Sequence, residues 1–205
     1  MANLYDVRGV EFAINQLDEM TLDVSYPRLF ANAYALQTIR LEIGPLAAWS
    51  PSSPKGVQAY VFEEFPSVAT NTIISIPTVE AKRTFWEKAV ILHREASRDK
   101  AMGYRYSRHY YDLYKMSETD VKEEAFADLQ LLKDVVNFNM KFYPISNAKF
   151  EEAFPGTFRI LPLKEQIEVL QKDYLEMNEM FFEEPVTFDE MTRRLRVLER
   201  EINQL

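Results

Sequence analysis

Short stretches of residues 1–80 alternate apolar and polar side chains, the pattern of a half-buried β-strand. In residues 38–43, three aliphatic side chains share one face, while Arg40 and Glu42 share the other. Patterns of this kind predict three strands, over residues 21–26, 38–43 and 72–76. Apolar spacing also predicts two short helices, over residues 6–20 and 57–65, and the turn-forming residues 50–54 predict a loop.

After residue 80 the apolar spacing changes to the 3.6-residue period of an α-helix. The first helix starts either at the capping box of Thr84 and Glu87 or a turn earlier, near Val79. Further helices are predicted over residues 104–116, 120–143, 163–182 and 188–205, and Thr187 with Glu190 caps the last. We therefore predict an α+β protein, with a small sheet layer in residues 1–80 and a helical bundle in residues 81–205.

The composition of the 205 residues restricts the available chemistry. The absence of cysteine rules out disulfides, thiol catalysis and zinc ribbons, and two histidines are too few for a multi-histidine metal cage. No apolar run reaches the roughly 18 residues of a membrane span, and no export signal is visible at the N-terminus. We expect a cytoplasmic protein that does not span a membrane.

The net charge of −8 is unevenly distributed along the chain. Residues 1–80 carry 4 bases and 9 acids, residues 81–116 carry 9 bases and 4 acids, and residues 117–205 carry 11 bases and 19 acids. The nine bases of the middle segment either form solvated ion pairs with the acidic remainder or form a phosphate-binding surface. They are Lys82, Arg83, Lys88, Arg94, Arg98, Lys100, Arg105, Arg108 and Lys115.

The predicted helix over residues 104–116 has two faces. The side that we assign to the core carries Tyr106, Tyr110 and Leu113. The opposite side carries polar and charged residues, namely Arg105, Arg108, His109, Asp112 and Lys115. Asp112 has two interpretations: an exposed ion pair with Arg108, or a carboxylate that holds an arginine or lysine in place while such cations bind phosphate oxygens.

Other candidate residues have structural interpretations. His93 lies on the same helical side as Phe85 and Ala89, so we expect a hydrogen-bonded core histidine. The tyrosines of residues 104–114 are expected to pack in the core rather than stack on bases. The sequence contains no P-loop, no dinucleotide glycine fingerprint and no Asp-x-Asp pair after a glycine turn. Glu42 is a metal ligand only if other acids join it.

Three motifs in the basic segment resemble a known family. They are Arg83-Thr84-Phe85-Trp86-Glu87-Lys88, Leu92-His93 and Arg108-His109-Tyr110-Tyr111-Asp112-Leu113. Flanking blocks extend the likeness, over residues 40–44, 76–80, 154–162 and 173–181. The pattern is similar to that of the AbiEii/AbiGii toxin family of nucleotidyltransferases, from bacterial abortive-infection and toxin–antitoxin systems. The resemblance covers nearly all of residues 35–205.

The resemblance implies a nucleotidyltransferase sheet joined to a helical domain, with Mg²⁺ as cofactor and a nucleoside triphosphate (NTP) as substrate. It implies that Lys88 contacts nucleotide phosphates, that Asp112 is a second residue of the site, and that Glu42 stands where a metal-binding acid would lie. Further predicted phosphate contacts are Arg83, Arg105, Arg108 and His109. Because some members transfer nucleotides to tRNA 3′ ends, the implied partners are an NTP, tRNA and a cognate antitoxin.

One family motif, a Gly-Ser or Gly-Gly turn followed by Asp-x-Asp, has no counterpart in these residues. Without that acid pair, two Mg²⁺ ions cannot be assembled for nucleotidyl transfer. We therefore expect the NTP-binding part of the site to be retained and the 205 residues alone to be inactive. The alternative is a non-catalytic interaction protein that binds an acidic partner or RNA through its two basic helices.

Overall fold

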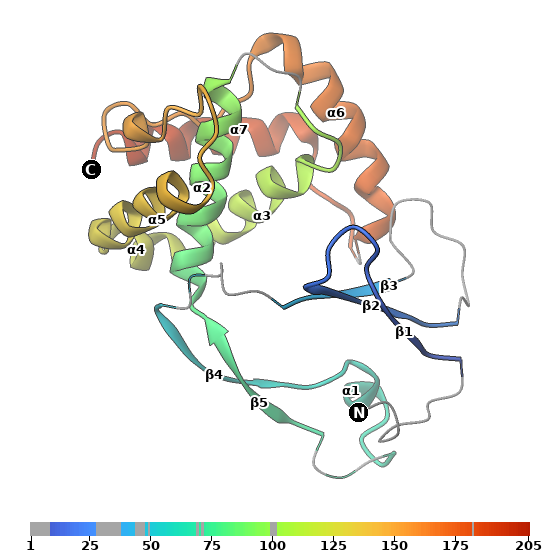
Figure 1. Cartoon of the computed structure of the whole chain (residues 1–205). Coiled ribbons are helices and arrows are strands. Elements are labelled where there is room, and N and C mark those ends of the chain that lie inside the picture. Colours follow the sequence, from blue (N-terminus) through green and yellow to red (C-terminus); the bar gives the residue numbers. More distant parts are fainter. Residues whose placement is uncertain are drawn as a thin grey trace.

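The computed structural model describes residues 9–27, 38–43, 48, 50–68, 70, 72–98, 102–181 and 183–205. Within these residues, two small antiparallel sheets come first along the chain and a helical bundle follows (Figure 1). The predicted α+β class is confirmed. The division into separate domains at residue 80 stays a prediction.

The first sheet has the strand order β1-β2-β3. Its strands are β1 (Glu11–Ile14), β2 (Thr21–Ser25) and β3 (Thr38–Glu42). The strands predicted over residues 21–26 and 38–43 are confirmed, whereas the helix predicted over residues 6–20 is wrong. Residues 11–14 pair with β2, with Phe12 and Ile14 on one face. The Asp18 carboxylate stabilises the turn between the two strands by accepting hydrogen bonds from Met20 N and Thr21 Oγ1.

The second sheet pairs β4 (Ser52–Val57) with β5 (Ile74–Val79). The loop predicted over residues 50–54 is therefore wrong from residue 52 onward, and the third predicted strand begins two residues later and continues past its proline. Pro54 and Pro77 lie opposite each other, which a two-stranded sheet tolerates because each strand has a free edge. Helix α1 (Val61–Glu64) forms four residues of the helix predicted over 57–65.

The bundle contains six α-helices among the described residues: α2 (Ala81–Ser97), α3 (Ser107–Ser117), α4 (Val121–Phe126), α5 (Leu129–Phe142), α6 (Ile167–Glu176) and α7 (Phe188–Ile202). Three 3-10 helices join them: η1 (Phe150–Glu152), η2 (Lys164–Gln166) and η3 (Met177–Met180).

The structure shows where three of the predicted helices begin, which can be compared with the capping residues in the sequence. Helix α2 begins at the earlier of the two predicted places, with Thr84 inside it. The single helix predicted over residues 120–143 is wrong, because Asp128 caps a new helix there by accepting the Leu131 amide. The cap predicted for α7 is confirmed, since Thr187 Oγ1 accepts the Glu190 amide.

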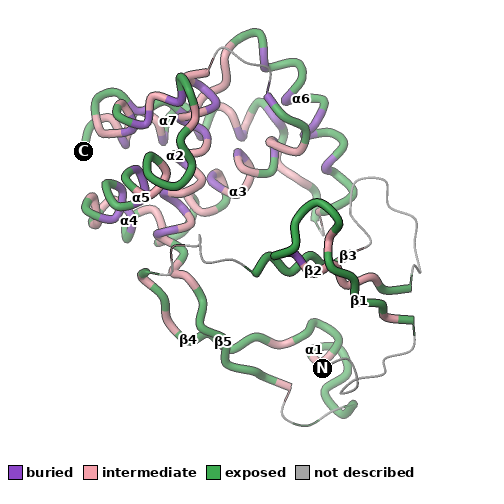
Figure 2. The backbone as a smooth tube through the Cα atoms, in the orientation of Figure 1, coloured by how far each residue is buried: buried purple, intermediate pink, exposed green. Residues whose placement is uncertain are grey.

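Helix α2 packs against α3, α4 and α5 and supplies much of the core. Figure 2 shows buried residues throughout the helices, whereas the strands are largely exposed. Trp86 is fully buried, and its indole N–H donates to the Ala125 carbonyl at 3.1 Å. His93 is also fully buried; its Nδ1 accepts the Arg159 amide and its Nε2 lies 3.0 Å from the Lys149 carbonyl. The prediction of a hydrogen-bonded core histidine is confirmed.

Candidate functional site

Lys88 on α2 faces the polar side of α3. Its Nζ lies 2.8 Å from Asp112 Oδ2 and 3.0 Å from His109 Nδ1. The two partners are three residues apart on α3, so one helical turn presents both to the same ammonium group. The Lys88 side chain is 21% exposed and that of Asp112 is 44% exposed, which leaves the pair accessible to a ligand from solution. Asp112 therefore pairs with Lys88, and the prediction that cations held in this way bind phosphate oxygens stays a prediction.

His109 is neutral at physiological pH. Burial, helped by the positive charges of Lys88, Arg108 and Arg94, lowers the pKa of His109 to about 3. An ammonium group can only donate hydrogen bonds, so Nδ1 of the neutral ring accepts from Lys88 and Nε2 carries the proton. The ring edge packs against Tyr106, with centroids 5.3 Å apart.

The polar network continues along the seam between α2 and α3. Arg94 donates from Nη2 to the Tyr106 hydroxyl at 3.0 Å and from Nε to Glu95 Oε1 at 2.7 Å. Arg98 donates to the same carboxylate oxygen at 3.0 Å. Glu95 is buried and shared by two guanidinium groups, so this end of the network has a surplus of positive charge. The α2–α3 cluster is the following set: Lys88, Arg94, Glu95, Arg98, Tyr106, His109 and Asp112.

The start of α3 is fixed by a carboxylate from α6. Asp173 is 5% exposed and accepts the Arg105 amide with Oδ1 and the Ser107 amide with Oδ2, both at 2.8 Å. Arg105 has a left-handed backbone with φ of 66°, a conformation that costs energy in a residue other than glycine. The two hydrogen bonds hold this turn in place, and the turn sets the direction in which His109 and Asp112 leave α3.

The other predicted site residues lie outside the α2–α3 cluster. Arg83 is 4% exposed and donates to the Ser50 carbonyl at 2.6 Å and to Glu87 at 2.8 Å, which ties α2 to the residues before β4. Arg108 is exposed and contributes to the site through its charge on His109. Arg105 contacts Asp173 through its backbone. The phosphate-binding roles of these three arginines stay predictions.

Glu42 lies at the end of β3, in the first sheet, where its charge interacts with that of Arg40 on the same strand. Figure 1 shows this sheet apart from the α2–α3 seam. Within the described residues, no three His, Cys, Asp or Glu side chains are placed to share a metal ion. The metal-binding role of Glu42 stays a prediction.

Five members of this arrangement were given no individual site role from the sequence: Arg94, Glu95, Arg98, Tyr106 and Asp173. The alternating charges of Arg94, Glu95 and Arg98 are a sequence pattern typical of a local ion-pair network on a helix. Tyr106 was assigned to the core side of its helix, and it does lie half-buried against the core. No local sequence pattern predicts the role of Asp173, because its hydrogen-bond partners are 66 and 68 residues away in the sequence.

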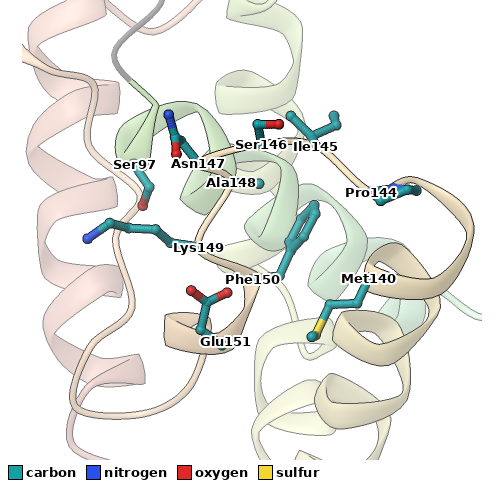
Figure 3. A pocket seen from close by; sticks show the side chains of 10 residues that line it. All are labelled: Ser97, Met140, Pro144, Ile145, Ser146, Asn147, Ala148, Lys149, Phe150 and Glu151. Atoms are coloured by element: carbon teal, nitrogen blue, oxygen red, sulfur yellow. The ribbon is translucent and has the colours of Figure 1, made fainter.

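A separate cleft of about 730 Å³ lies near the end of α2 (Figure 3). Ser97 of α2 and the loop residues Asn147 and Lys149 line it, together with Phe150 and Met140. Its lining includes no member of the α2–α3 cluster, and Lys149 is already paired with Glu152. This cleft is therefore not an extension of the candidate site.

Comparison with known families decides the assignment. A family model described as nucleotidyl transferase AbiEii toxin, Type IV TA system, matches residues 2–194. The chain belongs to the AbiEii family. No curated protein and no solved structure matches it. The matched region includes Lys88, His109 and Asp112, so the α2–α3 cluster lies within the part of the chain that the AbiEii family shares.

None of the described helices of this AbiEii family member combines the length and the hydropathy that a membrane span needs.

Proposed function

We propose that the α2–α3 cluster binds the phosphates of an NTP, with Lys88 as the central contact. A lysine ammonium has three N–H donors. Asp112 and His109 accept two of them, which orients the third toward a ligand. This held ammonium group is the observation that carries the proposal, because a directed charged donor suits a phosphate oxygen.

Two further features support phosphate binding at this place. The neutral His109 ring presents an N–H donor at Nε2 rather than an added charge. Arg94 and Arg98 share one carboxylate, and Arg108 is exposed beside the ring. The surplus positive charge attracts a polyanion, while Asp112 keeps Lys88 in position.

The proposal does not include catalysis by these residues alone. Nucleotidyl transfer by the AbiEii family mechanism needs clustered carboxylates for Mg²⁺, and the 205 residues contain no Asp-x-Asp. We propose that these residues bind NTP and do not transfer nucleotides by themselves. In the family, transfer to tRNA would need the missing acid pair; the genetic partner that we infer from the family is an antitoxin.

Nucleotide binding is tested by the fluorescence anisotropy of a labelled ATP analogue. Lys88→Ala is expected to weaken binding by about 10–100-fold, the effect of losing one charged hydrogen-bond donor. Lys133→Ala is the matched control, because Lys133 is an exposed lysine on α5 and its loss is expected to leave binding unchanged. Equal affinity of wild type and Lys88→Ala would refute the proposed site.

Catalysis is tested with labelled NTPs, Mg²⁺ and total tRNA. We expect no incorporation by the 205 residues. Robust incorporation that survives both Lys88→Ala and Asp112→Ala would contradict the inactivity and also the assignment of these two residues.

The alternative function, docking of an acidic partner or RNA on the basic helices, makes a different prediction. Of the eight bases in residues 81–116 that the structure describes, five are paired with carboxylates, which leaves fewer charges for a broad surface. Under this alternative, NTP would not bind and a polyanion without nucleotide bases, such as heparin, would bind as well as RNA.

A further inference from the structure

The first sheet is amphipathic, and its apolar side is exposed. Antiparallel register places the partners of each cross-strand pair on the same face. Three rows result on one face: Phe12–Val24–Ile39, Ile14–Leu22–Leu41 and, beyond the strand ends, Met20–Ile43. We call these eight residues the apolar sheet face. Six of them are between 44% and 67% exposed, and Val24 and Leu22 are half-buried.

The other face of the same sheet is polar. Ala13, Asp23 and Arg40 form its central row, and the Arg40 guanidinium donates to Asp23 at 2.9 Å. Asn15 donates to the second oxygen of the same carboxylate at 2.7 Å. Hydrogen-bonded and charged groups of this kind suit contact with water, so the apolar sheet face is the side suited to a protein contact.

The helices described for the chain do not cover this face. The bundle has its own closed core, built from residues of α2 to α7, and Figure 1 shows the first sheet apart from it. The edge strands β1 and β3 are largely exposed in Figure 2, and β2 between them is half-buried to buried. The face is therefore an exposed apolar patch of the kind that marks an interaction surface.

The size and charge of the patch identify its occupant. Eight apolar side chains, each offering on the order of 100 Å² or somewhat less, present about 600–800 Å², which approaches the roughly 800 Å² per partner of a standard interface. No charged residue belongs to the three rows, so nothing on the face selects a partner of opposite charge or repels an identical copy. We propose that the apolar sheet face binds the same face of a second copy of this chain.

The proposed dimer has a two-fold axis and is closed. Two three-stranded sheets pack face to face about 10 Å apart, as in a β-sandwich. β2 is the central strand of each sheet, so Leu22 and Val24 lie nearest the axis and meet their own counterparts. Phe12 and Ile14 on one edge strand then pack near the opposite copy's sheet. The proposal concerns a different surface from the α2–α3 cluster and does not depend on nucleotide binding.

Analytical ultracentrifugation tests the proposal by measuring the oligomeric state of the full 205 residues. The protein concentration is varied from nanomolar to high micromolar. Wild type is expected to be a dimer that dissociates on dilution. Ile14→Lys is expected to raise the dissociation constant by about 30-fold or more. Ala13→Lys, which adds the same charge at the neighbouring position on the polar face, is expected to leave it unchanged. If circular dichroism shows Ile14→Lys unfolded, Ile39→Ser replaces it with the same expected direction.

The absence of cysteine from the chain allows a second test. Val24→Cys, placed near the proposed axis, is expected to give a covalent dimer with a short bis-maleimide, whereas Ala13→Cys on the polar face is expected to stay monomeric on a denaturing gel. A wild-type chain that is monomeric at every concentration would overturn the proposal. So would a dimer that is insensitive to Ile14→Lys, or an assembly larger than two copies, because face-to-face packing closes at a dimer.

Discussion

Replacing Asp173 tests the physical reasoning about how α3 is positioned. Asp173→Ala removes both acceptors from the first turn of α3 and leaves the Arg105 and Ser107 amides without them. Ser107 is fully buried, so water does not readily take the place of the carboxylate. The left-handed turn at Arg105 loses its restraint at the same time.

The expected size of the effect follows from these contacts. A hydrogen bond to a charged group contributes about 1.5–3 kcal/mol, and loss of a single capping side chain typically costs about 0.5–2 kcal/mol. Asp173 makes two such bonds, and removing it also removes the cost of burying a carboxylate. We expect Asp173→Ala to lower the free energy of unfolding by about 3 kcal/mol. For a chain of this size that corresponds to a fall in Tm of about 6–12 °C.

Urea unfolding followed by circular dichroism at 222 nm measures the loss, and calorimetry gives the change in Tm. Lys172→Ala is the matched control, because Lys172 is the exposed neighbour on α6; its effect is expected within about 0.5 kcal/mol. Asp173→Asn keeps one acceptor oxygen but turns an NH₂ group toward the second amide, so most of the loss is expected to remain. A loss below about 1 kcal/mol for Asp173→Ala would refute the proposed anchoring of α3.

Two further predictions concern pH and capping. The unfolded chain protonates His109 near pH 6.5 and the folded chain only near pH 3, so the unfolded state binds more protons between these values and stability falls as the pH drops through this window. His109→Gln is expected to reduce the loss of unfolding free energy between pH 7 and pH 5 by about 2 kcal/mol in urea titrations; an unchanged difference would contradict the assigned pKa. Thr187→Ala, which removes the acceptor of the Glu190 amide, is expected to lower the unfolding free energy by about 1 kcal/mol, whereas Thr187→Ser is expected to have almost no effect.

Local signals predicted the elements whose structure depends on local contacts. The cap of α7 needs only Thr187 and the amide of Glu190, three residues away, and the sequence shows both. The helix predicted over residues 6–20 was wrong because Phe12, Ala13 and Leu17 suggest a helical stripe, whereas Phe12 and Ile14, two residues apart, share a face only in a strand. Pairing with β2 decided between the two patterns, and that is a tertiary contact. The break at Asp128 was missed because an apolar period continues across it, although aspartate is a strong capping residue.

Some features of the candidate site could likewise be predicted from local sequence patterns, and others depend on tertiary contacts. Family motifs and helix periodicity placed Lys88, His109 and Asp112 in the prediction, but on two separate helices. Their contacts depend on how α2 packs against α3, and helical spacing alone equally favoured an Arg108–Asp112 pair. Asp173 could not be found from local pattern, because its role is defined by amides on another helix.

The arrangement of charges is compatible with the proposed binding of an anion at the α2–α3 cluster of an acidic protein. The charges of Lys88 and Asp112 cancel, and His109 is neutral. These three groups therefore orient a hydrogen-bond donor but add no net charge. The attraction comes from their neighbours, since Glu95 balances only one of the two guanidinium groups that it binds and Arg108 is exposed nearby. Lys82, by contrast, lies between two carboxylates, those of Asp128 and Glu80, which together outweigh its positive charge. A net charge of −8 for the chain is therefore compatible with a positive potential at the α2–α3 seam, because at short range the pairing of individual side chains outweighs the total.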